Sequence, residues 1–149
     1  MSPPLHPWMK ALLWFVGGYN ALAGFSMLAF YHEGYQLLGL DKPDLVMPLQ
    51  LVGILVALFG VGYWMVARDP LLNRNVLVLG FWSKALGSVL GIVYVLRGQL
   101  PAVFLVVLFF ADIVYLLPFF LINRHLRRLA STSLACNSQH PVENDRSAA

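Results

Sequence analysis

The sequence predicts an all-α integral membrane protein that crosses the bilayer four times as an antiparallel four-helix bundle. Hydrophobic residues make up 59% of the 149-residue chain and charged residues only 11%. A soluble domain carries roughly 25% charged residues, because it must cover its surface for water. The apolar residues form four runs of about 20, the length that a helix needs to cross a bilayer. Most basic residues lie at the ends of these runs.

The four candidate spans are residues 8–30, 46–67, 76–96 and 102–122. Helix-breaking and turn-forming residues separate them: Gly34, Gly39 and Pro43, then Asp69, Pro70, Asn73 and Asn75, then Gly98 and Pro101. The last two connections are short, which predicts antiparallel packing of the last three helices in sequence order. The first connection is longer and more polar.

The two ends of the chain need separate arguments. An A-x-A pattern at residues 21–23 is compatible with a cleaved signal peptide, but the apolar run continues to Phe30, too long for a signal sequence. We therefore expect a retained first span and a transmembrane domain over residues 1–128. Residues 129–149 are polar and aperiodic, which predicts a disordered cytoplasmic tail. The single cysteine, Cys136, excludes a disulfide within the chain.

Loop charge predicts the orientation in the membrane. One side collects six basic residues, namely Lys10, Arg68, Arg74, Arg124, Arg127 and Arg128. The other side holds two basic residues, Lys42 and Arg97, together with the acidic Glu33, Asp41 and Asp44. The positive-inside rule places the richer side, and with it both termini, in the cytoplasm. The sequence thus predicts a multi-pass protein of the cytoplasmic (inner) membrane.

Small residues form a stripe on each of the first three spans. The stripes are Gly17, Ala21 and Gly24; Gly53, Ala57 and Gly60; and Gly80, Gly87 and Gly91. The fourth span lacks glycine and is rich in phenylalanine. Helices in lipid associate mainly by close packing at small residues, so these stripes predict helix–helix contacts.

Polar side chains inside the spans are the candidate functional residues. Lys84 lies about 12 Å into the third span, and Asp112 about 16 Å from the same membrane face, at 1.5 Å per residue. An isolated charge at the bilayer centre costs at least about 2.5–3.5 kcal/mol, so the similar depths predict an ion pair. Asn20, deep in the first span, and Tyr115, on the face of Asp112, complete this intramembrane polar cluster. Further candidates are Tyr19, Ser83 and Ser88.

The predicted Lys84–Asp112 pair allows two interpretations. In one, the pair neutralises itself and fixes the register of two helices. In the other, the pair lines a cavity for a proton, an ion or a small ligand. Pro118 should kink the fourth helix and free a backbone carbonyl near Val114, which is compatible with both interpretations.

The layout of the chain resembles a known family. The stretch GYWMVARDP at residues 62–70, the four spans, the longer first loop and the short later loops are similar to the DoxX-like group of small bacterial membrane proteins. The resemblance covers residues 8–128. It implies a four-span membrane protein, and some members are linked to membrane oxidoreductase assemblies or thiosulfate oxidation. No residue here matches a catalytic motif, so the resemblance assigns none.

Three classes of function are compatible with these features. The favoured class is a non-catalytic membrane subunit or scaffold that holds a partner, such as an oxidoreductase, at the membrane. The second is a small, oligomeric transporter or ion-conducting protein whose path passes Lys84, Asp112 and Asn20. The third, a membrane enzyme acting on a lipophilic substrate such as a quinone, has no HExxH, GxSxG or nucleotide-loop motif to support it.

Cofactors and partners are constrained mainly by the placement of polar residues. The histidines, His6, His32, His125 and His140, all lie outside the predicted spans, which argues against haem between the helices. The acidic residues near His32 match no metal-binding motif, and we interpret them as a solvated loop. No metal site is predicted, and no pattern selects a cofactor. The expected partners are the lipid bilayer and either a protein subunit or further copies of the chain, but not nucleic acid.

Overall fold

The computed structural model describes residues 5–39, 41 and 45–138, and the regular elements within these ranges are all helical. Four helices in the described part of the chain are long and apolar enough to cross a membrane, which confirms the predicted number of spans. The first three are α1 (Pro7–Ala29), α3 (Met47–Arg68) and α4 (Arg74–Leu96). Their ends lie within two residues of the predicted ends.

The fourth span consists of three consecutive segments. It begins with α5 (Phe104–Leu108), continues through a π-helical turn, η1 (Phe109–Ile113), and ends with α6 (Val114–Ser138). Pro118 lies inside α6. A π turn is a local widening of an α-helix and is frequent at functional sites. This one contains Asp112.

The helix continues well past the predicted end of the fourth span. The prediction of disorder from residue 129 is wrong for residues 129–138, which belong to α6, whereas residues 139–149 lie outside the described part. No glycine or proline interrupts the chain between Pro118 and Ser138. Leu129 packs against the apolar core, and the Ser131 hydroxyl donates to the carbonyls of Arg127 and Arg128 at 3.0 and 2.9 Å. Packing and local hydrogen bonds thus extend the helix despite its polar composition.

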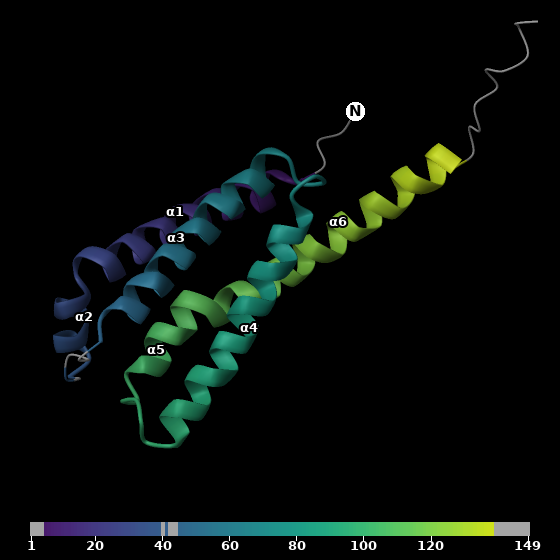
Figure 1. Ribbon diagram of the computed structural model, residues 1–149. Helices are drawn as coiled ribbons and strands as arrows, with labels where there is room; N and C mark the ends of the chain where they lie inside the picture. The colour runs from purple at the N-terminus through teal and green to yellow at the C-terminus, as the bar shows by residue number, and fades with distance from the viewer. Residues whose placement is uncertain (1–4, 40, 42–44, 139–149) are drawn as a thin grey trace, which may run out of the picture.

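The first connection also contains a helix that the sequence did not predict. The short helix α2 (Tyr31–Leu37) follows α1 after one residue, and Glu33 in its first turn complements the positive end of the helix dipole. Gly39 has a φ angle of 66°, a left-handed conformation that glycine adopts without steric cost and that ends this turn. The helix lies at the end of the molecule opposite the start of α1 (Figure 1).

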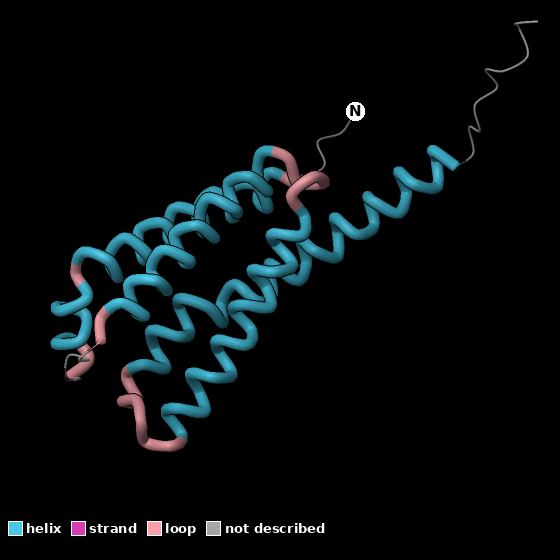
Figure 2. Tube along the Cα trace, in the orientation of Figure 1, coloured by secondary structure: helices cyan, strands magenta, loops and turns pink. Residues whose placement is uncertain are grey.

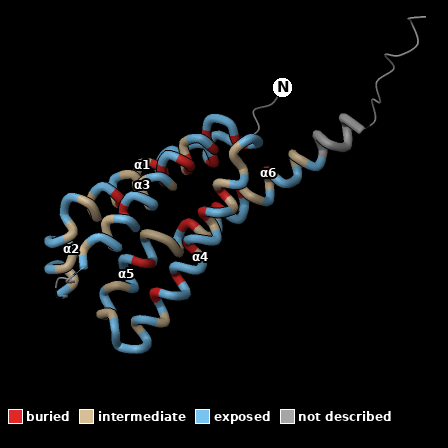
Figure 3. Tube along the Cα trace, viewed as in Figure 1, coloured by how far each residue is buried: buried red, intermediate tan, exposed pale blue. Residues whose placement is uncertain are grey.

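The spans form two pairs that are joined at one end of the molecule. Helices α1 and α3 lie side by side, and α4 packs against α5, η1 and α6 (Figures 1 and 2). The core is built by residues from all four spans, namely Leu5, Met9, Leu13, Val16, Tyr63, Val66, Ala67, Leu77, Tyr115, Phe119, Ile122 and Leu126. These residues come from the start of α1 and α4, the end of α3 and the middle of the fourth span (Figure 3). Away from this core, the buried residues lie between the two members of one helix pair, as Gly24 and Gly91 do.

The predicted small stripes of the first two spans are the contact between α1 and α3. A side-chain carbon added at Gly60 would lie 2.5 Å from the Gly17 carbonyl oxygen and 2.8 Å from the Ala21 nitrogen. A carbon added at Gly24 would meet the Gly53 carbonyl and lie 2.6 Å from the Ala57 nitrogen. The two backbones therefore touch directly, as the small residues predict.

The glycines of the third span have three different surroundings. Gly80 lies against the ring of Tyr63, and Gly91 lies against Leu108 and Phe104 of the bulky fourth span. Gly87, in contrast, has open space where a side chain would project. The predicted contact stripe is therefore real at Gly80 and Gly91 and interrupted at Gly87.

Substituting alanine at Gly24 and at Gly87 should have opposite effects on stability. Gly24→Ala forces a carbon into the backbone of α3 and should destabilise the fold by about 1–3 kcal/mol. Gly87→Ala adds a good helix former in open space and should be neutral or stabilising by up to about 1 kcal/mol. The measurement is the thermal unfolding midpoint of each purified variant in the same detergent. Equal midpoints for the two variants would contradict the close packing of α1 and α3.

Candidate functional site

The polar centre of the molecule is an ion pair between α4 and the π turn. The Lys84 ammonium donates to a carboxylate oxygen of Asp112 (Oδ1) and to the backbone carbonyl of Ala111, both at 2.8 Å. This is the pairing that the similar depths of the two residues predict. Among the residues that the structure describes, no other salt bridge is present. The Lys84 side chain is 7% exposed and that of Asp112 26%.

The π turn supplies the second acceptor of Lys84. In η1 the Val114 amide bonds to the Phe109 carbonyl, five residues back, which makes this turn wider than an α-helical turn. The Ala111 carbonyl lies within the turn and accepts from Lys84. Pro118 removes a backbone donor, which predicts a free carbonyl near Val114. The carbonyl that bonds the cation is instead Ala111, one turn earlier.

Aromatic rings surround the ion pair on the side of the other helices. The Lys84 nitrogen lies 5.4 Å from the centroid of the Tyr115 ring, a cation–π geometry. The Tyr115 ring lies 6.1 Å from that of Tyr19 on α1. The Tyr115 ring also lies 6.4 Å from the ring of Phe119, which packs against Tyr63 of α3 at 5.0 Å. All four spans thus contribute a polar or aromatic group to one cluster.

Asn20 does not take the role that its depth suggested. It is buried, with 5% of its surface exposed, but its amide nitrogen donates to the Val16 carbonyl in its own helix at 2.9 Å. The described contacts therefore do not connect Asn20 to either charge. Ser83 is exposed on α4, whereas Tyr19 and Tyr115 belong to the cluster.

Ser88 is the unusual polar residue of the site. It lies one helical turn beyond Lys84 and is 4% exposed, yet its hydroxyl has no hydrogen-bond partner among the described residues. A buried hydroxyl without a partner costs about 1–3 kcal/mol. Ser88 therefore carries a local energetic cost beside the ion pair.

The sequence singled out Tyr63 only within the stretch that resembles the DoxX-like group. In the structure it is almost fully buried and its ring packs edge-on against Phe119 at 5.0 Å. Tyr63 follows Gly60 by three positions, so it shares the face of the small stripe, and that spacing was the available signal.

The histidines and acidic residues give no metal centre in the described part. No group of three or more histidine, cysteine, aspartate or glutamate residues is close enough there to hold a metal ion. His32 contacts Gln36 at 3.2 Å on α2, and Asp44 of the same loop lies outside the described residues. The rings of His6 and His125 lie 5.2 Å apart with their planes tilted by 43°.

Comparison with protein families, curated proteins and solved structures finds no match for this chain. The class of protein therefore follows from the fold and the site. Four long apolar helices with a charged pair buried between two of them define a multi-pass membrane protein. The resemblance to the DoxX-like group stays a prediction.

Removing the Ser88 hydroxyl should stabilise the protein. Ser88→Ala deletes a buried hydroxyl that lacks a partner, so the unfolding free energy should rise by about 1–3 kcal/mol. The matched control is Ser83→Ala on the same helix, which should change stability by less than about 0.5 kcal/mol because Ser83 is exposed. Thermal midpoints of both variants in one detergent test this. A lower midpoint for Ser88→Ala alone would show that the hydroxyl has a partner, such as water, in the folded protein.

Proposed function

We propose that the protein is a non-catalytic subunit or scaffold of the cytoplasmic membrane, built as an antiparallel four-helix bundle with both termini in the cytoplasm. The observation that carries the proposal is the closed Lys84–Asp112 pair. A functional cation in a conduction path needs access to water or to the transported species. Here the Lys84 ammonium is occupied by a carboxylate, a carbonyl and an aromatic ring.

The surroundings of the pair support a structural role. An intramembrane charge is a functional hypothesis by default, but a neutralised pair with satisfied donors weakens that default. The partners lie on α4 and on the π turn of the fourth span, so the ion pair links two spans at one fixed depth. An apolar helical unit whose charges neutralise each other is better suited to anchoring another protein than to catalysing a reaction.

The apolar surface of the second span supports an interaction with a partner or with lipid. The half of α3 nearest to α2 contacts α1 through Gly53 and Ala57 of its small stripe. The rest of this half carries exposed apolar side chains, namely Leu51, Val52, Ile54, Leu55 and Leu58. Such a surface is covered in the membrane by lipid tails or by the helices of another subunit. The identity of that subunit as an oxidoreductase is a prediction from the resemblance alone.

The predicted orientation is part of the proposal. The described basic residues of one end, such as Arg68, Arg74 and Arg127, lie at the ends of α3 and α4 and in α6. The positive-inside rule assigns that end to the cytoplasm. The opposite end carries α2 and the turn after α4, where Glu33 and Asp41 are the acidic residues within the described part.

Transport of a proton or ion is the second candidate function. It is favoured by the partial exposure of Asp112, which is 26%, and by its place in a π turn. The Tyr115 ring lies against the Lys84 ammonium, and the buried Ser88 hydroxyl, which has no partner among the described residues, lies one helical turn from Lys84. A rearrangement of η1 that separates the two charges would open a polar path between α4 and the fourth span.

The proposed function is tested by native mass spectrometry of the full chain, extracted gently from its own membrane. We expect a second protein bound at fixed stoichiometry, because a scaffold is isolated with what it holds. Recovery of the chain alone, or only as copies of itself, would contradict the subunit proposal.

A flux assay in liposomes completes this test. Under the subunit proposal, the purified protein passes no protons or small ions, and Asp112→Asn changes nothing. The control is Asp69→Asn, which removes the same charge from a residue in the turn between α3 and α4. A pH-dependent flux that Asp112→Asn abolishes and Asp69→Asn retains would replace the subunit proposal by transport.

A further inference from the structure

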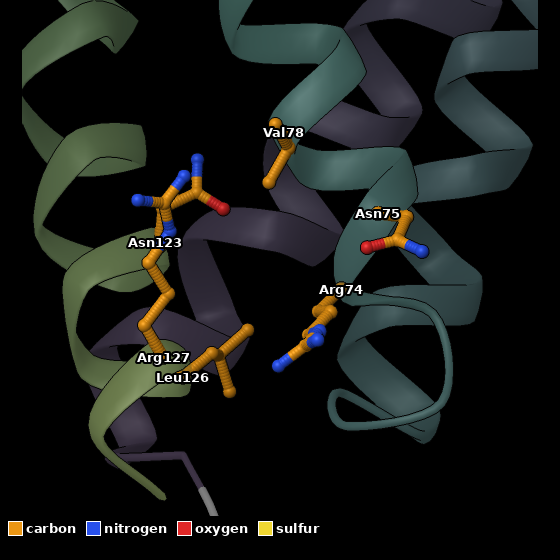
Figure 4. Close-up of a pocket in the computed structure, with 6 residues that line it drawn as sticks. All are labelled: Arg74, Asn75, Val78, Asn123, Leu126 and Arg127. Atoms are coloured by element: carbon orange, nitrogen blue, oxygen red, sulfur yellow. The ribbon is translucent and has the colours of Figure 1, made fainter. Parts of the chain in front are cut away.

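A pocket lies between α4 and α6 at the basic end of the molecule, where Arg74 precedes Lys84 by ten residues on the same helix. Its lining residues are Arg74, Asn75, Val78, Asn123, Leu126 and Arg127. Its volume of about 320 Å³ lies at the lower end of the range of roughly 300–1,000 Å³ for ligand pockets. Figure 4 shows Arg74 projecting from α4 toward α6, and Arg127 lying along α6 beside Asn123. Four hydrogen-bonding side chains and two apolar ones, Val78 and Leu126, thus line the pocket.

The charge of the pocket is not balanced by a described carboxylate. No acidic residue lines it, and neither arginine forms a salt bridge with a described residue. Asp69, in the turn before α4, directs its carboxylate to the Leu72 amide at 3.4 Å. Arg68, the basic residue that ends α3, lies over the ring of Trp14 at 5.6 Å instead. The two pocket arginines therefore place two positive charges on the wall of the pocket, without a described carboxylate beside them.

The start of α4 adds a further positive element to this wall. Arg74 and Asn75 are its first residues, and the first amides of a helix have no acceptor within it. Asn73, in the capping position, makes no capping bond, and its amide nitrogen donates to the Met65 and Asp69 carbonyls. No acidic residue lies in the first turn of α4. The positive end of the helix dipole is therefore uncompensated beside the two guanidinium groups.

We propose that this pocket binds a phosphate group, supplied by the headgroup of an anionic phospholipid. Guanidinium groups bind phosphate oxygens through paired, charge-assisted hydrogen bonds, and an uncapped helix start favours the same charge. Basic pockets between membrane helices at the cytoplasmic side bind anionic headgroups in this way. Val78 and Leu126 in the pocket wall, and the apolar spans beside it, can pack against the acyl chains of such a lipid.

The test is native mass spectrometry of the full chain in maltoside micelles with added phosphatidylglycerol, phosphatidylcholine or inorganic phosphate. We expect one retained phosphatidylglycerol in preference to phosphatidylcholine. The variant Arg74→Gln with Arg127→Gln should weaken that binding roughly tenfold or more, because two charge-assisted contacts are lost. The control variant, Lys10→Gln with Arg124→Gln, removes two charges from exposed residues outside the pocket and should retain the lipid.

The remaining outcomes separate the sources of the phosphate. Binding of inorganic phosphate that the pocket variant abolishes, without preference for phosphatidylglycerol, would assign the pocket to free phosphate rather than to lipid. Equal loss of lipid in the two double variants would mean a diffuse basic surface and would overturn the proposal. A folding defect is checked by the thermal midpoint, and Arg74→Lys with Arg127→Lys keeps the charge but loses the paired geometry, so its binding should be intermediate.

Discussion

The cost of placing a charge in hydrocarbon governs the centre of this molecule. Neither Lys84 nor Asp112 is tolerated alone inside a membrane span, because an unpaired charge there costs at least about 2.5–3.5 kcal/mol. The structure meets this constraint by bringing the two together at 2.8 Å. Because the partners lie on different spans, α4 and η1 cannot slide or separate without exposing both charges. The register of the second helix pair follows from this one contact.

The rest of the architecture forms around that fixed point. A backbone carbonyl within the π turn, that of Ala111, accepts a second hydrogen bond from Lys84. Tyr115, the core residue next to the turn, covers the cation and connects it to Tyr19 of the first pair. Beyond it, from Phe119 to Leu126, the fourth span packs into the core that joins both pairs. The first pair needs no charge, because glycine lets the backbones of α1 and α3 touch.

The sequence predicted the features that follow from regular helix geometry. It did not predict those in which several hydrogen-bond partners or local conformations were available. Residue spacing gives depth, so Lys84 and Asp112 could be matched across two helices. The role of Ala111 could not be foreseen, because a π turn depends on how the whole span accommodates its neighbours. Asn20 was misjudged because every helix offers a buried amide a carbonyl four residues back, and Asn20 uses that of Val16. The helix through residue 138 was missed because its polarity suggested disorder while its packing was invisible.

Lys84 and Asp112 hold their two spans together only if the two charges are coupled to each other, and a double-mutant cycle measures this coupling directly. Unfolding free energies would be compared for Lys84→Met, Asp112→Leu and the double variant in the same lipid–detergent mixture. Each single variant should lose about 3–5 kcal/mol, because it leaves one buried charge unpaired. The double variant should recover most of that loss. If the two losses instead add, the charges are not coupled to each other, and the ion pair does not hold the spans together.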